Sequence, residues 1–222
     1  GSVISVTPVA QEIIKLQIQV PNPVDFLPGQ YVRLQVPGMS ATRSYSMANA
    51  SGSDHLEFFI RVVPEGQFSA WLTQARVGDA VSVGSPRGTF FLRHEDRPRL
   101  MVAGGTGLAP FLAMLRHAHN TATVPTTLIV GARTPQHLIA QSELGALARD
   151  VKGLTIHTVV EDAGEAAEIA AKARARQHLE PGRAIGDRPP GQHGARRHVH
   201  VLSHKIRGNR QLPPAAIAQH AQ

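Results

Sequence analysis

A glycine-rich turn at residues 102–110, VAGGTGLAP, limits what this chain can fold into more than any other stretch. It follows the compact apolar run from Leu100 to Ala103 and precedes APFLAMLRHAHN, whose apolar positions recur at helical spacing. Glycines between a buried strand and a helix let backbone N–H groups approach a pyrophosphate, and the helix N-terminus adds positive potential. The turn lacks the Lys-Ser/Thr of a Walker A loop and the spaced G-x-G-x-x-G pattern. It predicts a nucleotide site, with a tight strand-to-helix turn that binds nothing as the alternative.

The residues after this turn continue the alternation of strands and helices. TTLIVGA (126–132) and GLTIHTVVED (153–162) are typical of buried strands, and PQHLIAQSELGALARD (135–150) between them is typical of an amphipathic helix. Strands that alternate with helices indicate a parallel sheet wound by right-handed crossovers. We therefore expect an α/β nucleotide-binding domain over residues 98–162.

The residues before the turn have a different pattern. Short segments of alternating apolar and polar residues recur between Gly, Pro, Asp and Ser: SVISVTPV, EIIKLQIQV, GQYVRLQV, LEFFIRVV and AVSVGSP. Short, regularly spaced strands predict a small antiparallel β-barrel over residues 3–97, with one short helix at 67–75. The predicted fold is thus two-domain, an antiparallel barrel followed by an α/β parallel sheet, with the boundary in the loop at 94–99.

The chain carries a net charge of +7, but the charge is unevenly placed. Residues 1–162 hold 13 Lys and Arg against 12 Asp and Glu, which gives +1, and residues 163–222 hold 10 against 4, which gives +6. The basic charge belongs to this tail, so the sequence argues against a nucleic-acid partner for the whole protein. A nucleic-acid binder that acts through the tail alone stays as an alternative. Apart from one expected helix that ends at Pro181-Gly182, the tail is typical of loop or disorder.

The absence of cysteine excludes several classes of site within this chain. Disulfides, cysteine-ligated zinc, a catalytic thiol and a cysteine-held iron–sulfur cluster are all ruled out. We expect a cytoplasmic protein without a membrane segment, because no apolar run is long enough to cross a bilayer. The histidines of HVHVLSH (198–204) are interpreted as part of a solvated tail, so no metal site is predicted.

Two segments of the first domain carry residues suited to a flat, phosphorylated ligand. In SATRSYSMAN (40–49), strand geometry puts Arg43 and Tyr45 on one face and Ser44 and Ser46 on the other. A guanidinium suits a phosphate and a ring suits another ring, whereas an exposed strand with an ordinary Arg–Tyr contact is the alternative. IRVVPEGQFSAWL (60–72) offers backbone amides and a hydroxyl at a helix start, although an ordinary helix cap would look the same.

Taken in order, these motifs resemble the ferredoxin–NADP reductase family, in particular the flavin and nucleotide modules of oxygenase reductases. Arg43-Ser44-Tyr45-Ser46 is similar to the family's flavin motif. The resemblance implies that Arg43 binds the flavin pyrophosphate, that Tyr45 packs on the isoalloxazine ring and that Ser46 lies near the reactive N5 atom.

The resemblance extends over about residues 3–162. It implies a second flavin motif of Gly66, Gln67, Phe68 and Ser69 on the pyrophosphate, with Arg61 and Val63 beside the ribityl and adenosine portion. It also implies a nicotinamide-nucleotide loop with Gly104, Gly105, Thr106 and Gly107, in which Thr106 lies near the nicotinamide, and an adenosine-side contact from Gly131 and Arg133. Ser46 and Thr106 are thus the expected catalytic residues.

The family resemblance implies an NAD(P)H-dependent flavoprotein reductase that passes electrons through FAD to a one-electron acceptor. FAD is expected rather than FMN, NADH and NADPH stay open, and the acceptor would be a 2Fe–2S ferredoxin or an oxygenase component. The tail departs from the family, because it lacks the Cys-Gly-Pro-Pro segment and offers only GDRPPGQHG (186–194). A changed reading frame after about residue 163 would explain this. The alternative function is a non-catalytic flavin- or nucleotide-binding remnant of such a reductase.

Overall fold

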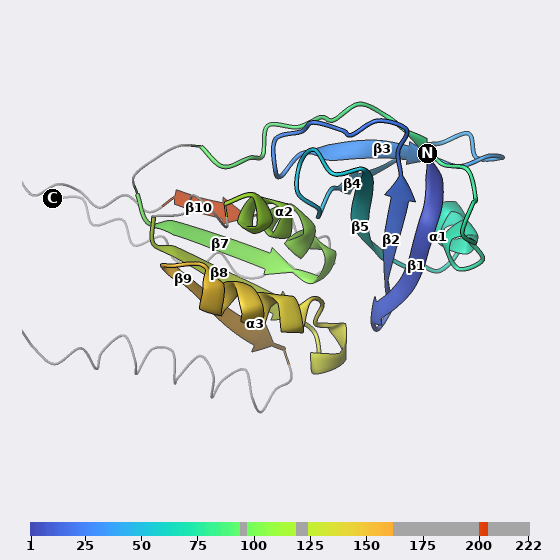
Figure 1. Ribbon diagram of the computed structural model, residues 1–222. Helices are drawn as coiled ribbons and strands as arrows, with labels where there is room; N and C mark the ends of the chain where they lie inside the picture. The colour runs from blue at the N-terminus through green and yellow to red at the C-terminus, as the bar shows by residue number, and fades with distance from the viewer. Residues whose placement is uncertain (94–96, 119–123, 162–199, 204–222) are drawn as a thin grey trace, which may run out of the picture.

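Figure 1 shows the computed structural model of the chain, in which an antiparallel β-structure lies beside a parallel sheet. The structure describes residues 1–93, 97–118, 124–161 and 200–203. Antiparallel strands come first along the chain and a parallel sheet with helices follows, so the predicted fold class is confirmed.

The first part of the chain forms two three-stranded antiparallel sheets, with strand orders β1-β2-β5 and β4-β3-β6. The strands are β1 (Ser2–Ala10), β2 (Ile13–Gln19), β3 (Tyr31–Gln35), β4 (Arg43–Ser46), β5 (His55–Arg61) and β6 (Ser82–Val83). Alternation sets the inner face: Leu16 and Ile18 of β2 are fully buried, while Gln17 between them is only half-buried. Both sheets contribute to one hydrophobic core, which is the interior of the predicted barrel.

Strand β5 departs from this alternation, because its residues Leu56 to Ile60 are all buried. Phe58 packs in the barrel core, whereas its neighbour Phe59 packs in a second core that belongs mainly to the parallel sheet. A strand that is buried on both faces has a packed layer on each side. Strand β5 is therefore the element through which the barrel meets the second domain.

The second part of the chain forms a four-stranded sheet with the order β10-β7-β8-β9, and all its neighbouring strands are parallel. These strands are β7 (Arg99–Gly104), β8 (Thr126–Ala132), β9 (Leu154–Val160) and β10 (His200–Ser203). The interpretation of the whole tail as loop or disorder is wrong at β10, which pairs with the edge of β7. A strand of only four residues depends on pairing with the edge of a neighbouring strand, and its own sequence does not encode that pairing. The rest of the tail, with its expected helix, lies outside the described residues.

Three α-helices and two short 3₁₀ helices complete the described structure: α1 (Gln67–Leu72), η1 (Gly105–Leu108), α2 (Ala109–Ala118), η2 (Pro135–His137) and α3 (Gln141–Asp150). The continuous helix predicted over 135–150 is wrong at its start, because Leu138 is extended and Ala140 is left-handed with φ 55°. The break lets Ile139 enter the core of the second domain, where it is 1% exposed. Tertiary packing thus outweighs helical propensity at this point.

Helix α2 lies between the two domains. Its residues Phe111 to Leu115 are all buried, as expected of a helix that is covered on every side. Most of them pack in the core of the parallel sheet, but Ala113 packs in the barrel core. The helix that follows the glycine turn is therefore also the helix that joins the domains.

Candidate functional site

The strand with Arg43 and Tyr45 lies beside β3, and its register fixes which way each side chain faces. Tyr45 stands opposite Val32 and Arg43 stands opposite Leu34, two residues that are fully buried in the barrel core. Directly opposite residues of an antiparallel pair share a face, so Arg43 and Tyr45 share the inner face, as the sequence predicts. Ser44 is on the other face and is exposed. Ser46 is half-buried opposite Tyr31.

The Tyr45 ring joins the two segments that the sequence singled out in the barrel. Its centroid lies 5.1 Å from that of Phe68 in a tilted arrangement and 6.5 Å from that of Phe58 in an edge-on arrangement. Phe68 belongs to the Gly66–Ser69 segment at the start of α1 and is 3% exposed. Aromatic contacts of this geometry fix both rings. The structure therefore brings the two predicted flavin motifs into direct contact.

The electrostatic surroundings of Tyr45 differ from those of a solvated tyrosine. Burial raises the pKa of Tyr45 to about 12, and the positive charge of Arg43 lowers this pKa in part. Arg43 itself is exposed and donates from Nη1 to the carbonyl oxygen of Thr42 at 3.2 Å. A guanidinium carries further donors, so Arg43 can meet an anion at the surface while Tyr45 stays neutral in the barrel wall.

Backbone and hydroxyl groups close the turn between β5 and α1. The Val63 N–H donates to Ser69 Oγ at 2.9 Å, and Ser69 is 7% exposed. The Gly66 N–H donates to the Val63 carbonyl oxygen at 3.1 Å, and a Cβ on Gly66 would lie 3.2 Å from Ser69 Oγ. A side chain at residue 66 would therefore have to displace the Ser69 hydroxyl or the Val63 carbonyl by a few tenths of an ångström. A hydroxyl that accepts one hydrogen bond can still donate one, which leaves Ser69 a proton for an anionic ligand.

Three other predicted residues of the barrel lie around this turn. Gln67 is exposed, and Val63 has 54% of its surface exposed although it is apolar. Arg61 pairs with Glu12, with Nη2 and Oε2 3.1 Å apart. Both partners of this pair are about half-exposed, so the pair contributes little to stability and leaves the Arg61 guanidinium accessible.

The glycine turn of the second domain begins where β7 ends, at Gly104. Gly105 opens the short helix η1 with φ 51°, and a Cβ there would meet no atom within 4 Å. The turn thus leaves open space beside the backbone just ahead of α2, as a nucleotide phosphate requires. Gly107 and Thr106 are half-buried within η1.

Strand β8 supplies the adjoining predicted residues. Gly131 lies directly across from Gly104 at the carboxyl ends of two neighbouring parallel strands, and the exposed Arg133 follows it. Ligands of open α/β sheets bind outside the carboxyl ends of the strands. In Figure 1 the arrowhead of β7 points toward the barrel, and η1 lies against β5. The nucleotide turn therefore adjoins the strand that leads into the second flavin segment.

A cluster of charged residues that the sequence patterns did not predict lies at the contact between the domains. Arg116 of α2 binds Glu57 of β5, with Nη1 and Oε1 2.9 Å apart, and Glu143 of α3, with Nε and Oε1 2.6 Å apart. We call these three residues the interdomain cluster. A signal was available, because Glu57 is the one carboxylate in the apolar strand LEFFI and a buried carboxylate needs a partner.

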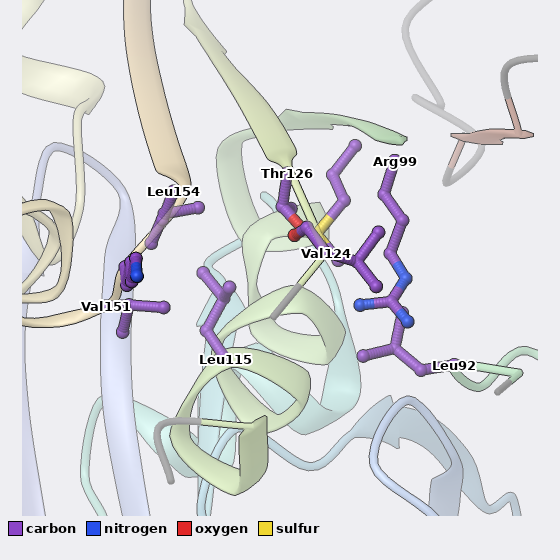
Figure 2. Close-up of a pocket in the computed structure, with 9 residues that line it drawn as sticks. Leu92, Arg99, Leu115, Val124, Thr126, Val151 and Leu154 are labelled. Atoms are coloured by element: carbon purple, nitrogen blue, oxygen red, sulfur yellow. The ribbon is translucent and has the colours of Figure 1, made fainter. Parts of the chain in front are cut away.

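A small pocket lies at the opposite end of the parallel sheet (Figure 2). It is lined by residues that begin the strands, including Arg99 of β7, Thr126 of β8 and Leu154 of β9, together with Leu115 of α2. Because nucleotides bind at the carboxyl ends of such strands, this pocket is not the nucleotide site. Within the described part of the chain there is also no helix long and apolar enough to span a membrane. The same residues contain no group of three or more potential metal ligands.

Two domain families match the chain. A model of the oxidoreductase FAD-binding domain matches residues 1–92, and a model of the oxidoreductase NAD-binding domain matches residues 101–184. The first match contains both flavin segments, and the second contains the glycine turn. The domain limits predicted at 97 and 162 stay predictions.

Similar proteins are named as components of oxygenases. The toluate 1,2-dioxygenase electron transfer component of Pseudomonas putida is 41% identical over 162 residues, which cover 72% of this chain and 48% of the relative. Methane monooxygenase component C of Methylosinus trichosporium is 39% identical over 167 residues, which cover 70% and 49%. The chain thus spans about half of the length of these relatives.

Solved structures have the same fold. The ferredoxin reductase in carbazole 1,9a-dioxygenase superposes with a TM-score of 0.64 at 29% identity, covering 73% of this chain and 51% of that one. A ferredoxin NADP⁺ reductase from Neisseria gonorrhoeae with bound FAD and NADP gives a TM-score of 0.67 at 23% identity, covering 80% and 77%, and shows the fold alone. With an FAD-binding and an NAD-binding oxidoreductase domain that together match most of its length, the chain belongs to the ferredoxin reductase family.

Proposed function

We propose that this protein is an NAD(P)H-dependent flavoprotein reductase that passes electrons to a one-electron acceptor. The observation that carries the proposal is the contact between Tyr45 and Phe68, which joins the Arg43–Ser46 strand to the Gly66–Ser69 turn. Two segments that are each unspecific in sequence thereby form one surface with a guanidinium, an aromatic ring and backbone amides. When bound there, a flavin accepts a hydride and releases electrons one at a time.

The residues of the barrel hold the flavin in this proposal. Arg43 neutralises the pyrophosphate from the rim, and Ser69 and the amides after Gly66 donate hydrogen bonds to it. Tyr45 supplies a flat, neutral surface for the isoalloxazine ring, and its raised pKa keeps the phenol protonated at neutral pH. Ser46 lies near the reactive end of the isoalloxazine ring. Ser44 belongs to the same strand and faces away from Arg43 and Tyr45. Gln67 and Phe68 belong with Gly66 to the turn at the pyrophosphate, and Arg61 and Val63 border the ribityl and adenosine portion.

The residues of the second domain hold the nicotinamide nucleotide. Gly104, Gly105 and Gly107 let the pyrophosphate approach the backbone ahead of α2, and Thr106 orients the nicotinamide end. Gly131 and Arg133 flank the adenosine, and Arg133 is a candidate partner for the 2′-phosphate of NADPH. We infer FAD rather than FMN as the resident flavin, since the FAD-binding domain model matches the barrel.

The acceptor is inferred from the relatives, which are named as components of oxygenases, one of them as an electron transfer component. We propose a 2Fe–2S ferredoxin or an oxygenase component as the partner that receives the electrons. Iron–sulfur and haem centres take one electron at a time, so such partners would match the chemistry that a flavin held by this chain would supply. The cytoplasmic location expected from the sequence is retained as part of the proposal.

The experiment that tests this function is an anaerobic reduction followed by visible absorption. We expect the purified protein to hold FAD, to show flavin bands, and to lose them when NADH or NADPH is added. The nucleotide that bleaches the flavin at the lower concentration is the preferred donor. A flavin that binds but stays oxidised would favour the non-catalytic remnant. A protein that retains neither FAD nor FMN would overturn the assignment of the Arg43–Ser46 strand.

A further inference from the structure

The guanidinium of Arg116 connects the two domains at the ends of the segments that carry the candidate site. Its Nη1 donates to the Ala48 carbonyl oxygen at 2.7 Å and to Glu57 Oε1 at 2.9 Å. Ala48 is two residues beyond Ser46, and the Ala48 N–H donates to the Glu57 carbonyl oxygen at 2.8 Å. One side chain of the nucleotide domain therefore binds the barrel directly behind the Arg43–Ser46 strand.

The opposite side of the same guanidinium binds within its own domain. Nε and Nη2 donate to Glu143 Oε1 and Oε2 at 2.6 and 2.8 Å, which is a bidentate pair. This pair fixes the plane of the guanidinium, because both carboxylate oxygens and two nitrogens must stay aligned. Helix α2 begins directly after the glycine turn, so the position of Arg116 is tied to that of the turn.

The cluster is closed to water on its barrel side. The Glu57 side chain is 7% exposed, that of Arg116 is 23% exposed and that of Glu143 is 34% exposed. Gln17 Nε2 donates to Glu57 Oε2 at 3.3 Å, and Lys15 Nζ lies 3.9 Å from the same oxygen. Burial alone would lower the pKa of Arg116, but its hydrogen bond to Glu143 and the charge of Glu57 outweigh burial and raise the pKa. Removing one partner of such a buried charge pair leaves the other charge without compensation.

We propose that Arg116 is a positioning residue: by binding Glu57, Ala48 and Glu143 together, it sets the domain orientation in which the nicotinamide reaches the flavin. The proposal rests on the proposed function. Hydride transfer requires the two reacting atoms to be close and aligned, and a shift of about 1 Å costs about 100-fold in rate. The domains also share apolar contacts, but these are not directional. One backbone hydrogen bond, from the Gln11 N–H to the Gln136 carbonyl oxygen at 2.8 Å, also joins the domains. The interdomain cluster is the side-chain contact that the structure describes between β5, α2 and α3.

The first test measures domain orientation without any cofactor. The chain has no cysteine, so Gln74→Cys and Thr155→Cys, both at exposed positions, place one spin label on each domain. We expect a narrow distance distribution in the parent protein and a broadened or shifted one in Arg116→Met. Arg149→Met, which removes an exposed cation from the same domain, should leave the distribution unchanged. An unchanged distribution in Arg116→Met would overturn the proposal.

The second test measures flavin reduction in the FAD-loaded protein by stopped flow. Arg116→Met should slow the limiting rate of reduction by about 10- to 100-fold, while the flavin content and the nucleotide Kd change little. Arg116→Lys keeps the charge without the bidentate geometry and should be intermediate. A broadened distance distribution with an unchanged limiting rate would also overturn the positioning role. If the parent protein is not reduced at all, the proposed function fails, and the distance measurement alone decides whether Arg116 orients the domains.

A double variant addresses the case in which Arg116→Met does not fold. That variant leaves the Glu57 carboxylate buried without its partner, whereas Glu57→Gln with Arg116→Met removes both charges together. The side-chain amide introduced by Glu57→Gln would keep an oxygen as acceptor for Gln17 Nε2. The folded double variant should show the same broadened distances and slow reduction, and parent-like values for both would contradict the proposal.

Discussion

Tyr45 shows how a single residue is changed by the fold around it. Its ring packs against Phe58 and Phe68, and its strand partner Val32 is fully buried. The phenol is thereby moved out of water while Arg43 on the same face stays exposed. The pair gives the candidate flavin surface a neutral, flat wall and a charged rim.

The titration of Tyr45 is our first prediction. Burial raises its pKa from 10.0 to about 12, so the folded state holds the phenol proton more tightly than the unfolded state. The contribution of Tyr45 to stability is then complete below pH of about 10 and is lost as the pH rises toward 12. The chain has two tyrosines, so Tyr31→Phe leaves Tyr45 alone in an ultraviolet titration. We expect a midpoint of about 12, which Arg43→Met should raise further. A midpoint near the ordinary tyrosine value would contradict the burial.

Ser69 carries the second prediction at this scale. Ser69→Ala removes the acceptor of the Val63 N–H, a hydrogen bond of 2.9 Å in a partly buried turn. We expect the free energy of unfolding to fall by about 1–2 kcal/mol and flavin retention to weaken. Urea unfolding measures the first effect, and flavin content after gel filtration measures the second. Ser142→Ala, at an exposed position of α3, is the matched control and should change neither.

At the scale of elements, a glycine has opposite effects on stability in the glycine turn and in α3. Gly105 has φ 51°, a conformation that side chains rarely adopt, although its Cβ position is open. Gly145 lies inside α3, and a Cβ there would come no closer than 3.6 Å to Arg149 Nη1. One glycine is therefore required by the backbone, and the other weakens its helix.

Paired alanine substitutions test this contrast. Gly105→Ala should lower the free energy of unfolding by about 1–2 kcal/mol and raise the KM for the nucleotide, because it strains the turn and fills the open space. Gly145→Ala should raise the free energy of unfolding by about 0.5–1 kcal/mol, because alanine favours the helix. Chemical denaturation of both variants measures the two changes. Equal signs for the two variants would refute the assigned backbone roles.

At the scale of the whole molecule, Gly29 shows how closely the two halves approach each other. It has φ 109°, and a Cβ there would lie 2.1 Å from the Phe90 carbonyl oxygen and 2.5 Å from Met114 Cε of α2. The loop before β3 thus contacts the helix that begins at the glycine turn. Only a residue without a side chain allows this approach.

Gly29→Ala is our prediction for this close approach. We expect it to lower the free energy of unfolding by about 3 kcal/mol or more, since it adds overpacking to the strain of a positive φ. Gly78→Ala isolates the strain alone, because Gly78 has φ 95° and no atom within 4 Å of its Cβ position. Thermal unfolding of the two variants should separate the two contributions. Similar losses in both would mean that the close approach of Gly29 to the Phe90 carbonyl oxygen and to Met114 contributes nothing.

Local sequence signals predicted most of the elements, and they failed where packing between distant segments decides. The alternation in β2 and the apolar run of β8 predicted both strands correctly. Alternation is typical of a strand with one buried face, and a continuous apolar run is typical of a strand buried on both faces. The break before α3 and the strand β10 were missed, since the first depends on a core contact of Ile139 and the second on the free edge of β7.

The sequence by itself determined the family and predicted the residues of the candidate site, because glycine turns and short polar motifs can be recognised from consecutive residues. It did not determine how these motifs meet. The Tyr45–Phe68 contact, the burial of β5 on both faces and the bond from Arg116 to Glu57 join segments far apart in the chain. Such contacts depend on the relative placement of whole elements, which no local pattern encodes. Only the tertiary structure brings the motifs together and links the two domains.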